Sequence, residues 1–288
     1  MKKLVILLLM VAVPAVAQDL ATEVKATEAA PGIYMLEGAN GFSSNMGLMV
    51  GDEHVLLIDN GMPAITAGLM EKVKEMAGRP VDFIVNTHAH GDHVGSNAAL
   101  AGEGAVIFAH HNLREKLQEN LEYAGGVEGL PVITFSDEVT FHANGKQAVV
   151  FHVAAAHTNG DSVIHFPEQN VIDAGDLFFN GMFPFIDLDG GGSVEGYMAG
   201  QQRMMDMSDD ETIIIPGHGP IATRADLREA INVLADSKAR VKKLVDAGMT
   251  QDEVLEANPL ADYHDKWNWF FITTEKMTIT LYRSLTDG

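Results

Sequence analysis

The sequence predicts an α/β fold, and three observations lead to that expectation. Short runs of β-branched and apolar residues alternate with helical segments along the chain after residue 17. No low-complexity linker interrupts the alternation. The 288 residues are 47% hydrophobic, which is enough for a large core. We therefore expect residues 18–288 to form a single domain.

The first half of the chain contains five expected strands and two expected helices. The strands are expected at residues 33–36, 46–50, 55–58, 81–85 and 105–109. The turn Asp59-Asn60-Gly61 leads from the third strand into a helix at about residues 64–77. A polar helix over residues 112–123 follows the fifth strand.

The second half repeats this alternation. Strands are expected at residues 148–154, 162–166, 171–172 and 212–215. A helix is expected at residues 194–207, and helical segments from residue 225 close the chain.

Residues 1–17 are typical of a secretory signal peptide. Two lysines precede an apolar run at residues 4–13, and Ala15-Val16-Ala17 resembles a cleavage site. The apolar run is short for a membrane span, so an uncleaved anchor is the less favoured alternative. We expect an exported, periplasmic protein that keeps no membrane attachment after cleavage.

Charge and cysteine content narrow the possible functions. The formal net charge is −21, and removing the two lysines of the signal makes it −23. Such acidity argues against binding of nucleic acid, whose phosphates require a basic surface. The chain has no cysteine, so a thiolate ligand and a cysteine nucleophile are both excluded. We expect a small-molecule substrate, and any metal must bind through nitrogen and oxygen donors.

The segment His88-Ala-His90-Gly-Asp92-His93 places three imidazoles and a carboxylate within six residues, at the end of an expected strand. Imidazole nitrogen and carboxylate oxygen are common ligands of zinc and related metals. His88 and His90 can point to the same side and bind one ion, while Asp92 and His93 suit a second ion. Chance clustering is the alternative in a chain with 12 histidines. The ordered spacing favours metal binding.

This segment resembles the signature of the metallo-β-lactamase superfamily, and three further motifs follow in the order that the family shows. His157 stands in Ala-His-Thr-Asn-Gly-Asp, Asp176 in Ala-Gly-Asp, and His218 in Pro-Gly-His-Gly, each after a β-rich run. The resemblance covers nearly the whole chain after the signal. It implies a four-layer αββα sandwich, in which two mixed β-sheets are flanked by helices.

The resemblance also implies the ligands of two zinc ions. His88, His90 and His157 would bind one ion, Asp92, His93 and His218 would bind the other, and Asp176 would bridge them. A hydroxide between the ions would be the nucleophile, and Asp92 is expected to orient it. Similar histidine and aspartate sets also bind iron or manganese.

Several other residues have two interpretations. Asp59 resembles a family carboxylate that orients a ligand histidine, or it is a turn or helix-cap residue. His110 and His111 are expected in the turn before a helix, and three other histidines in packing or surface positions: His142, His152 and His165. Residues 187–193 are expected to form a flexible connection near the active-site rim. Residues 178–185, rich in phenylalanine, form either a wall of the substrate pocket or part of the core.

The expected substrate class follows from two departures from the β-lactamase pattern. Asp176 stands where cysteine-containing β-lactamases place a thiolate, and Phe179 where they commonly place a lysine. Both changes argue against efficient β-lactam hydrolysis, although export brings the protein to where β-lactams arrive. We expect hydrolysis of amide, ester or lactone bonds, with β-lactams among the candidates. The alternatives are a phosphodiesterase with the same metal centre and a metal-loaded accessory protein without turnover.

Overall fold

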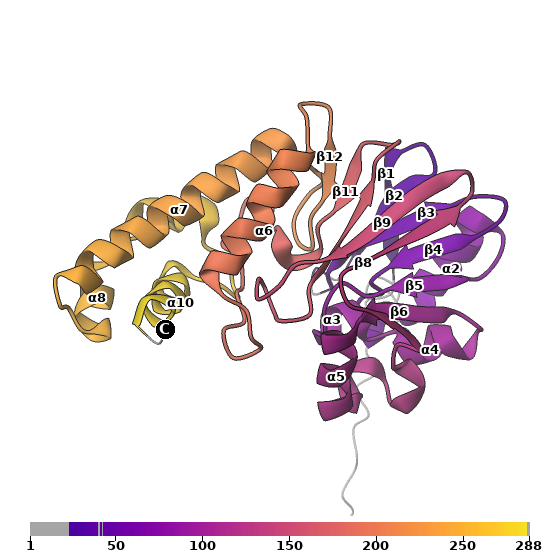
Figure 1. Cartoon of the computed structure of the whole chain (residues 1–288), viewed down its shortest axis with the longest axis horizontal. Helices are drawn as coiled ribbons and strands as arrows, with labels where there is room; N and C mark the ends of the chain where they lie inside the picture. The colour runs from indigo at the N-terminus through magenta and orange to yellow at the C-terminus, as the bar shows by residue number, and fades with distance from the viewer. Residues whose placement is uncertain (1–22, 40, 42, 287–288) are drawn as a thin grey trace, which may run out of the picture.

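The computed structural model describes residues 23–39, 41 and 43–286, and in this part of the chain it contains two β-sheets (Figure 1). The first sheet has seven strands in the order β1-β2-β3-β4-β5-β6-β7. Their bounds are Val24–Ala30, Ile33–Gly38, Asn45–Val50, Val55–Ile58, Phe83–Val85, Val106–His110 and Ile133–Phe135. Strands β4 to β7 run parallel to one another and β1 to β4 antiparallel, so the sheet is mixed.

The second sheet is also mixed and has six strands in the order β13-β12-β11-β10-β9-β8. In chain order, β8 to β13 span Glu138–Ala143, Lys146–His152, Ser162–Phe166, Val171–Asp173, Ile213–Ile215 and Ala222–Thr223. Only β11 and β12 pair in parallel. Their carboxyl ends therefore lie at the same edge of the sheet.

The two sheets pack face to face through a shared apolar layer. Met49, Leu56 and Val85 from the first sheet belong to the same buried cluster as Ile164 and Phe166 from the second. This layer forms because alternate residues of a strand face opposite sides of its sheet. The expected sandwich of two mixed sheets is confirmed.

Helices cover the outer faces of both sheets. On the first sheet lie α2 (Thr66–Ala77) and α4 (Asn97–Gly102), whose Leu69 and Leu100 pack with Leu57. On the second sheet lie α6 (Val194–Met207) and α7 (Arg224–Asp246), as Figure 1 shows. Two shorter helices, α3 (Gly91–Val94) and α5 (His111–Glu119), lie near the carboxyl ends of β5 and β6. These layers complete the αββα arrangement.

Residues 224–286 extend the sandwich. Helix α7 has 23 residues, which corresponds to about 34 Å. It begins with a reciprocal capping box between Thr223 and Asp226. Figure 1 shows α8 (Gln251–Ala257) and α10 (Thr274–Thr286) beside it, away from the sheets. The short helix α9 (His264–Trp267) precedes α10.

Several element boundaries differ from the sequence-based expectation. Helix α5 ends at Glu119, and residues 121–124 form a separate 3-10 turn that stops at Gly125, whose φ is 76°. Strand β5 covers only Phe83–Val85 of the expected residues 81–85, and just before it the side chain of Asp82 accepts hydrogen bonds from Val55 N and Arg79. Strands β1, β7, β8 and β13 were not expected. Most of β1 is exposed, so it lacks the apolar alternation that marks a strand.

The expected signal peptide, residues 1–17, lies outside the described residues. Among the residues that are described, no helix combines the length and the apolar character needed to span a bilayer.

Candidate metal centre

Seven histidine and aspartate side chains meet at one edge of the sandwich. His88 and His90 follow the buried strand β5, and helix α3 presents Asp92 and His93 directly afterwards. The other three come from the second sheet and follow the ends of strands: His157 after β9, Asp176 after β11 and His218 after β12. All seven residues singled out from the sequence therefore lie together. Their assignment as ligands remains a prediction.

The first group consists of His88, His90, His157 and Asp176, whose potential ligand atoms all lie within 4.8 Å of one another. His157 Nε2 is 3.0 Å from His90 Nδ1. Asp176 Oδ2 is 3.4 Å from His157 Nε2 and 3.8 Å from His88 Nε2. Three imidazoles and one carboxylate oxygen thus surround a common point, which suits a tetrahedral ion.

The second group consists of Asp92, His93 and His218, and its potential ligand atoms also lie within 4.8 Å of one another. Asp92 Oδ2 is 3.6 Å from His93 Nε2 and 3.3 Å from His218 Nε2. Asp176 adjoins this group through its other oxygen, Oδ1, at 3.1 Å from His93 Nε2 and 3.5 Å from His218 Nε2. The two oxygens of Asp176 therefore face different groups.

Close backbone packing fixes Asp176 between the groups. It lies in a 3-10 turn after β11, and Gly217 N donates a hydrogen bond to Gly175 O at 2.8 Å. A Cβ at Gly217 would lie 2.0 Å from Asp176 Oδ1. Any larger residue at 217 would displace the carboxylate, which explains the glycine before His218.

The buried polar atoms of this centre fit bound metal. His88 Nε2, His93 Nε2 and Asp176 Oδ1 are buried and have no hydrogen-bond partner. Leaving such atoms unsatisfied costs about 1–3 kcal/mol each. All three point toward the common points of the two groups, where an ion would satisfy them. The donor set contains only imidazole and carboxylate, which are ligands of zinc, iron and manganese.

The electrostatics differ between the two groups. Burial lowers the pKa of His88 and lowers that of His157 to about 4, so both imidazoles are neutral and able to bind metal. Burial also opposes protonation of His93 and His218. Asp176 and Asp92 outweigh it there and raise both pKa values, that of His218 to about 9. The second group is thus the one that concentrates negative charge.

Asp59 orients two of the histidines. Its buried carboxylate accepts hydrogen bonds from Thr87 N at 2.8 Å and Thr87 Oγ1 at 2.6 Å, and it pairs with His93 Nδ1 at 2.6 Å. Thr87 Oγ1 in turn lies 3.0 Å from His88 Nδ1. These contacts keep Nε2 of both rings directed at the centre. These contacts are the ones that the orienting interpretation of Asp59 requires, and the role itself stays a prediction.

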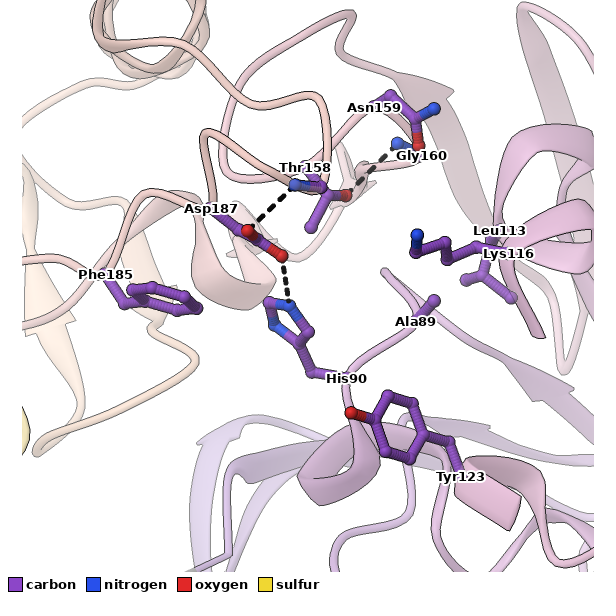
Figure 2. Close-up of a pocket in the computed structure, with 11 residues that line it drawn as sticks. Ala89, His90, Leu113, Lys116, Tyr123, Thr158, Asn159, Gly160, Phe185 and Asp187 are labelled. Atoms are coloured by element: carbon purple, nitrogen blue, oxygen red, sulfur yellow. Dashed lines mark hydrogen bonds and ion pairs between the residues drawn. The ribbon is translucent and has the colours of Figure 1, made fainter. Parts of the chain in front are cut away.

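Asp187 holds His90 in the same way, and the sequence did not reveal this role. Figure 2 shows its carboxylate against His90, with 3.1 Å between Oδ2 and Nε2, so that Nδ1 of the ring faces the first group. Residues 187–193 lie beside the centre, as expected, and Ser193 caps the next helix. Hydrogen bonds hold the segment in place. Asp187 N donates to His157 O, Gly190 N donates to Asp187 Oδ1, and Ser193 N donates to Ala156 O, all at 2.8–2.9 Å.

The phenylalanine-rich segment divides between the core and the site. Phe178 and Phe183 are fully buried in the core. Phe179 stacks on His218 with 5.0 Å between ring centroids, and Phe185 lies 5.6 Å from the rings of His90 and His157. Both interpretations of the segment therefore hold, for different residues. At residue 179, where β-lactamases of the family commonly have a lysine, the ring of Phe179 packs against the proposed ligand His218.

Two of the cavities beside the centre share several lining residues. The larger has a volume of about 410 Å³ and is lined by Asp92, Asp176 and His218 at one end and by aromatic residues elsewhere. The smaller, about 290 Å³, is shown in Figure 2 and shares His90, Tyr123 and Phe185 with the larger. It also contains Lys116, which pairs with Glu119 at 3.1 Å.

The remaining histidines lie outside both groups of potential ligands. His110 is buried at the start of α5, where its Nδ1 accepts from Asn112 N at 3.3 Å and its ring stacks on His152 at 3.7 Å. This agrees with the expected position in the turn before a helix. His142 and His165 lie in strands β8 and β10.

Comparison with known proteins identifies the family. The model of the metallo-beta-lactamase superfamily matches residues 39–218. The metallo-beta-lactamase IND-1 of Chryseobacterium indologenes is 25% identical over 182 residues, which cover 63% of this chain and 74% of that protein.

Two solved structures share the fold. A metallo-beta-lactamase from Pontibacter korlensis has a TM-score of 0.64 and 21% identity, covering 74% of this chain and 100% of that one. A stereoselective inverting sec-alkylsulfatase from Pseudomonas sp. has a TM-score of 0.69 and 16% identity, covering 92% of this chain and 50% of that one. The family match extends over more than half of the sequence and contains all seven residues of the centre. The chain belongs to the metallo-beta-lactamase superfamily.

Proposed function

We propose that this protein is an exported dinuclear zinc hydrolase that cleaves amide, ester or lactone bonds, with β-lactams among the candidate substrates. Members of its superfamily are metal-dependent hydrolases, and the finer assignment goes beyond that. The observation that carries it is the position of Asp176, whose two oxygens face two separate groups of potential ligands at 3.1–3.8 Å.

The proposal assigns three separate ligands to each ion and one shared ligand to both. His88, His90 and His157 would hold one ion, Asp92, His93 and His218 the other, and Asp176 both. Two such ions activate a water molecule at neutral pH and polarise the carbonyl that it attacks. The unsatisfied buried atoms of His88, His93 and Asp176 support this assignment.

The surrounding residues have separate tasks in this scheme. Asp59, Thr87 and Asp187 fix which ring nitrogen of three histidines faces the centre. Of the two carboxylates that line the larger cavity, Asp92 is the more open, because 25% of its side chain is exposed compared with 5% for Asp176. Asp92 is therefore placed to orient the nucleophile and to accept its proton.

A carbonyl substrate is favoured over a phosphodiester. Among the described residues, the lining of the larger cavity contains no lysine or arginine that could pair with a phosphate. Lys116 in the smaller cavity offers one cation for a substrate carboxylate, which supports keeping β-lactams as candidates. The complete set of potential ligands favours turnover over a purely accessory role.

The experiment that tests this proposal is a substrate panel on zinc-loaded protein. We would assay an aryl ester, a lactone, a thioester, a cephalosporin and an aryl phosphodiester, each with zinc and with a chelator. We expect zinc-dependent turnover of at least one carbonyl substrate and none of the phosphodiester. Faster cleavage of the phosphodiester, or no turnover of any carbonyl substrate, would contradict the proposal.

Export is tested separately. Cell fractionation should recover the protein in the periplasm, and mass spectrometry should find a mature chain that begins at Gln18. Recovery of an intact chain starting at Met1 in the cytoplasm would contradict this part.

A further inference from the structure

The segment between α9 and α10 forms one wall of the larger cavity, although it lies far beyond the region matched by the family model. Trp269, Phe270 and Phe271 line this cavity together with Asp92 and His218. The family match ends at residue 218. The C-terminal extension therefore contributes directly to the surroundings of the proposed metal centre.

Trp269 is held in a fixed position. Its indole Nε1 donates a hydrogen bond to Phe183 O at 2.9 Å, and its backbone N donates to Ile272 O at 3.2 Å. The ring lies 6.0 Å from Phe179 and 6.1 Å from His218, measured between centroids. This side of the cavity is thus built before any substrate arrives.

Phe271 forms the part of the same wall that lies next to Phe185. Its ring meets Phe185 edge-on at 5.3 Å and lies 5.7 Å from the ring of Trp269. Lys276 anchors the residue, since its Nζ donates to Phe271 O at 2.7 Å and lies 4.9 Å from the centre of the ring. The wall consequently connects the two phenylalanines that flank the centre, Phe179 and Phe185.

The exposure of this wall points to a binding function. Phe270 is 71% exposed and Phe271 41% exposed, in a protein whose formal charge is −21. Apolar surface left in water forgoes about 25 cal/mol per Å² of stabilisation. Clustered aromatic exposure at the rim of a cavity is characteristic of a ligand site.

The charges of the cavity restrict the chemistry of that ligand. Carboxylates Asp92 and Asp176 lie at the end nearest the centre, and the described lining residues include no lysine or arginine. Outside the proposed metal centre, no described lining residue offers a cation to a negatively charged group, whereas an alkyl or aryl group would displace water from six aromatic rings. At about 410 Å³ the cavity is within the usual range for small-molecule sites.

We propose that Trp269 and Phe271 form an acyl-binding wall, and that the substrate is a neutral ester or lactone carrying an apolar alkyl chain. This inference rests on the proposed hydrolase function. In the reaction, a water oxygen bonds to the carbonyl carbon, the bond from that carbon to the leaving oxygen breaks, and the leaving oxygen gains a proton. The wall takes no part in these steps and selects the chain attached to the carbonyl.

The first test measures chain-length selectivity with zinc-loaded protein and 4-nitrophenyl acetate, butyrate and octanoate. Burying one methylene is worth up to about fourfold in kcat/KM. We expect octanoate to exceed acetate by at least about tenfold, which is less than full burial of the added methylenes would give. Phe271→Ala should lower the octanoate-to-acetate ratio at least about threefold, a loss equivalent to roughly one buried methylene. Val132→Ala, a truncation to alanine at an exposed apolar residue outside the cavity, should leave the ratio unchanged.

The second test measures binding without turnover. The chain has two tryptophans, and Trp267 is buried, so a neutral ligand in the cavity should mainly alter the fluorescence of Trp269. Titrating chelator-stripped protein with methyl octanoate should give a saturable change that Trp269→Phe abolishes. The same variant should retain part of the chain-length selectivity, because phenylalanine preserves an aromatic surface.

The outcomes separate this inference from the proposed function. Turnover with no dependence on chain length, or a dependence that Phe271→Ala leaves intact, would overturn the acyl-binding wall but not the hydrolase. Saturable binding of methyl octanoate without turnover of any carbonyl substrate in the panel would support the wall and contradict the hydrolase. Absence of any fluorescence change would overturn the wall.

Discussion

Replacing Asp59 by asparagine tests how the centre keeps its histidines in the correct tautomer. Asp59 has a φ of 56°, a left-handed conformation that asparagine tolerates far better than alanine. The substitution therefore changes the chemistry of the side chain with little change in backbone strain. An amide oxygen can still accept from Thr87 N. The amide NH₂ would then face His93 Nδ1, where a carboxylate oxygen now accepts.

The expected effect follows from the contacts that are lost. The new amide N–H and the Nδ1–H of His93 would both be donors facing each other. His93 must therefore move its proton to Nε2, the atom that faces the second group. Loss of such an orienting contact typically lowers metal affinity by about 10- to 100-fold. The unfolding free energy should also fall by about 1.5–3 kcal/mol, the usual range for one hydrogen bond to a charged group.

The assay is competition for zinc against a chromophoric chelator, combined with urea unfolding of the chelator-stripped protein. We expect weakened binding of one zinc equivalent and a lower urea midpoint. If Asp59→Asn binds both equivalents as tightly as the unchanged protein, the tautomer argument is refuted. A lower urea midpoint with unchanged zinc binding would show that Asp59 stabilises the fold without controlling the centre.

Three further predictions concern other parts of the molecule. Asp187→Asn should weaken the zinc equivalent held by His90 by about tenfold in the same chelator competition, and should change the unfolding free energy less, because Asp187 is partly exposed. Burial and the neighbouring His152 lower the pKa of His110 to about 4, so the folded protein resists a proton that the unfolded chain binds near pH 6.5. The stability that neutral His110 contributes is present above pH 6.5 and is lost as the pH falls toward 4. His110→Asn should remove on the order of 1 kcal/mol of this pH dependence of the unfolding free energy, after a discount for solvent screening. Urea titrations measure it. Phe183→Ala should lower the unfolding free energy by about 3–5 kcal/mol through a core cavity, and a loss below 1 kcal/mol by calorimetry would contradict its placement.

The sequence was sufficient to predict that these seven residues lie together, although by two different routes. His88, His90, Asp92 and His93 stand within six residues after an expected strand, whereas His157, Asp176 and His218 were identified through the family resemblance. His88 to His93 are also adjacent in the chain, so their proximity requires no tertiary knowledge. The grouping around Asp176 came from the family resemblance and agrees with the distances.

The supporting contacts could not be predicted in the same way. Asp187 and His90 are 97 residues apart, and no periodic pattern links them. The glycines after Asp187 suggested flexibility, whereas hydrogen bonds to the His157 loop order the segment. Likewise, Trp269 and Phe271 lie in a stretch expected to be helical, and their place in the cavity depends on how the C-terminal helices pack.

Three of the four missed strands have a common physical cause. Strand β1 is mostly exposed, β7 has three residues and β13 two, so none shows enough alternation of apolar and polar residues. They form because a neighbouring strand offers hydrogen-bond partners. Such pairing is a tertiary effect that local sequence does not record.

The most direct test of the central claim is the zinc content of the reconstituted protein and the location of each ion by anomalous diffraction. The account predicts two zinc ions per chain, one among His88, His90 and His157, the other among Asp92, His93 and His218, with Asp176 contacting both. A stable stoichiometry of one zinc per chain, or two ions with Asp176 bound to only one, would contradict it.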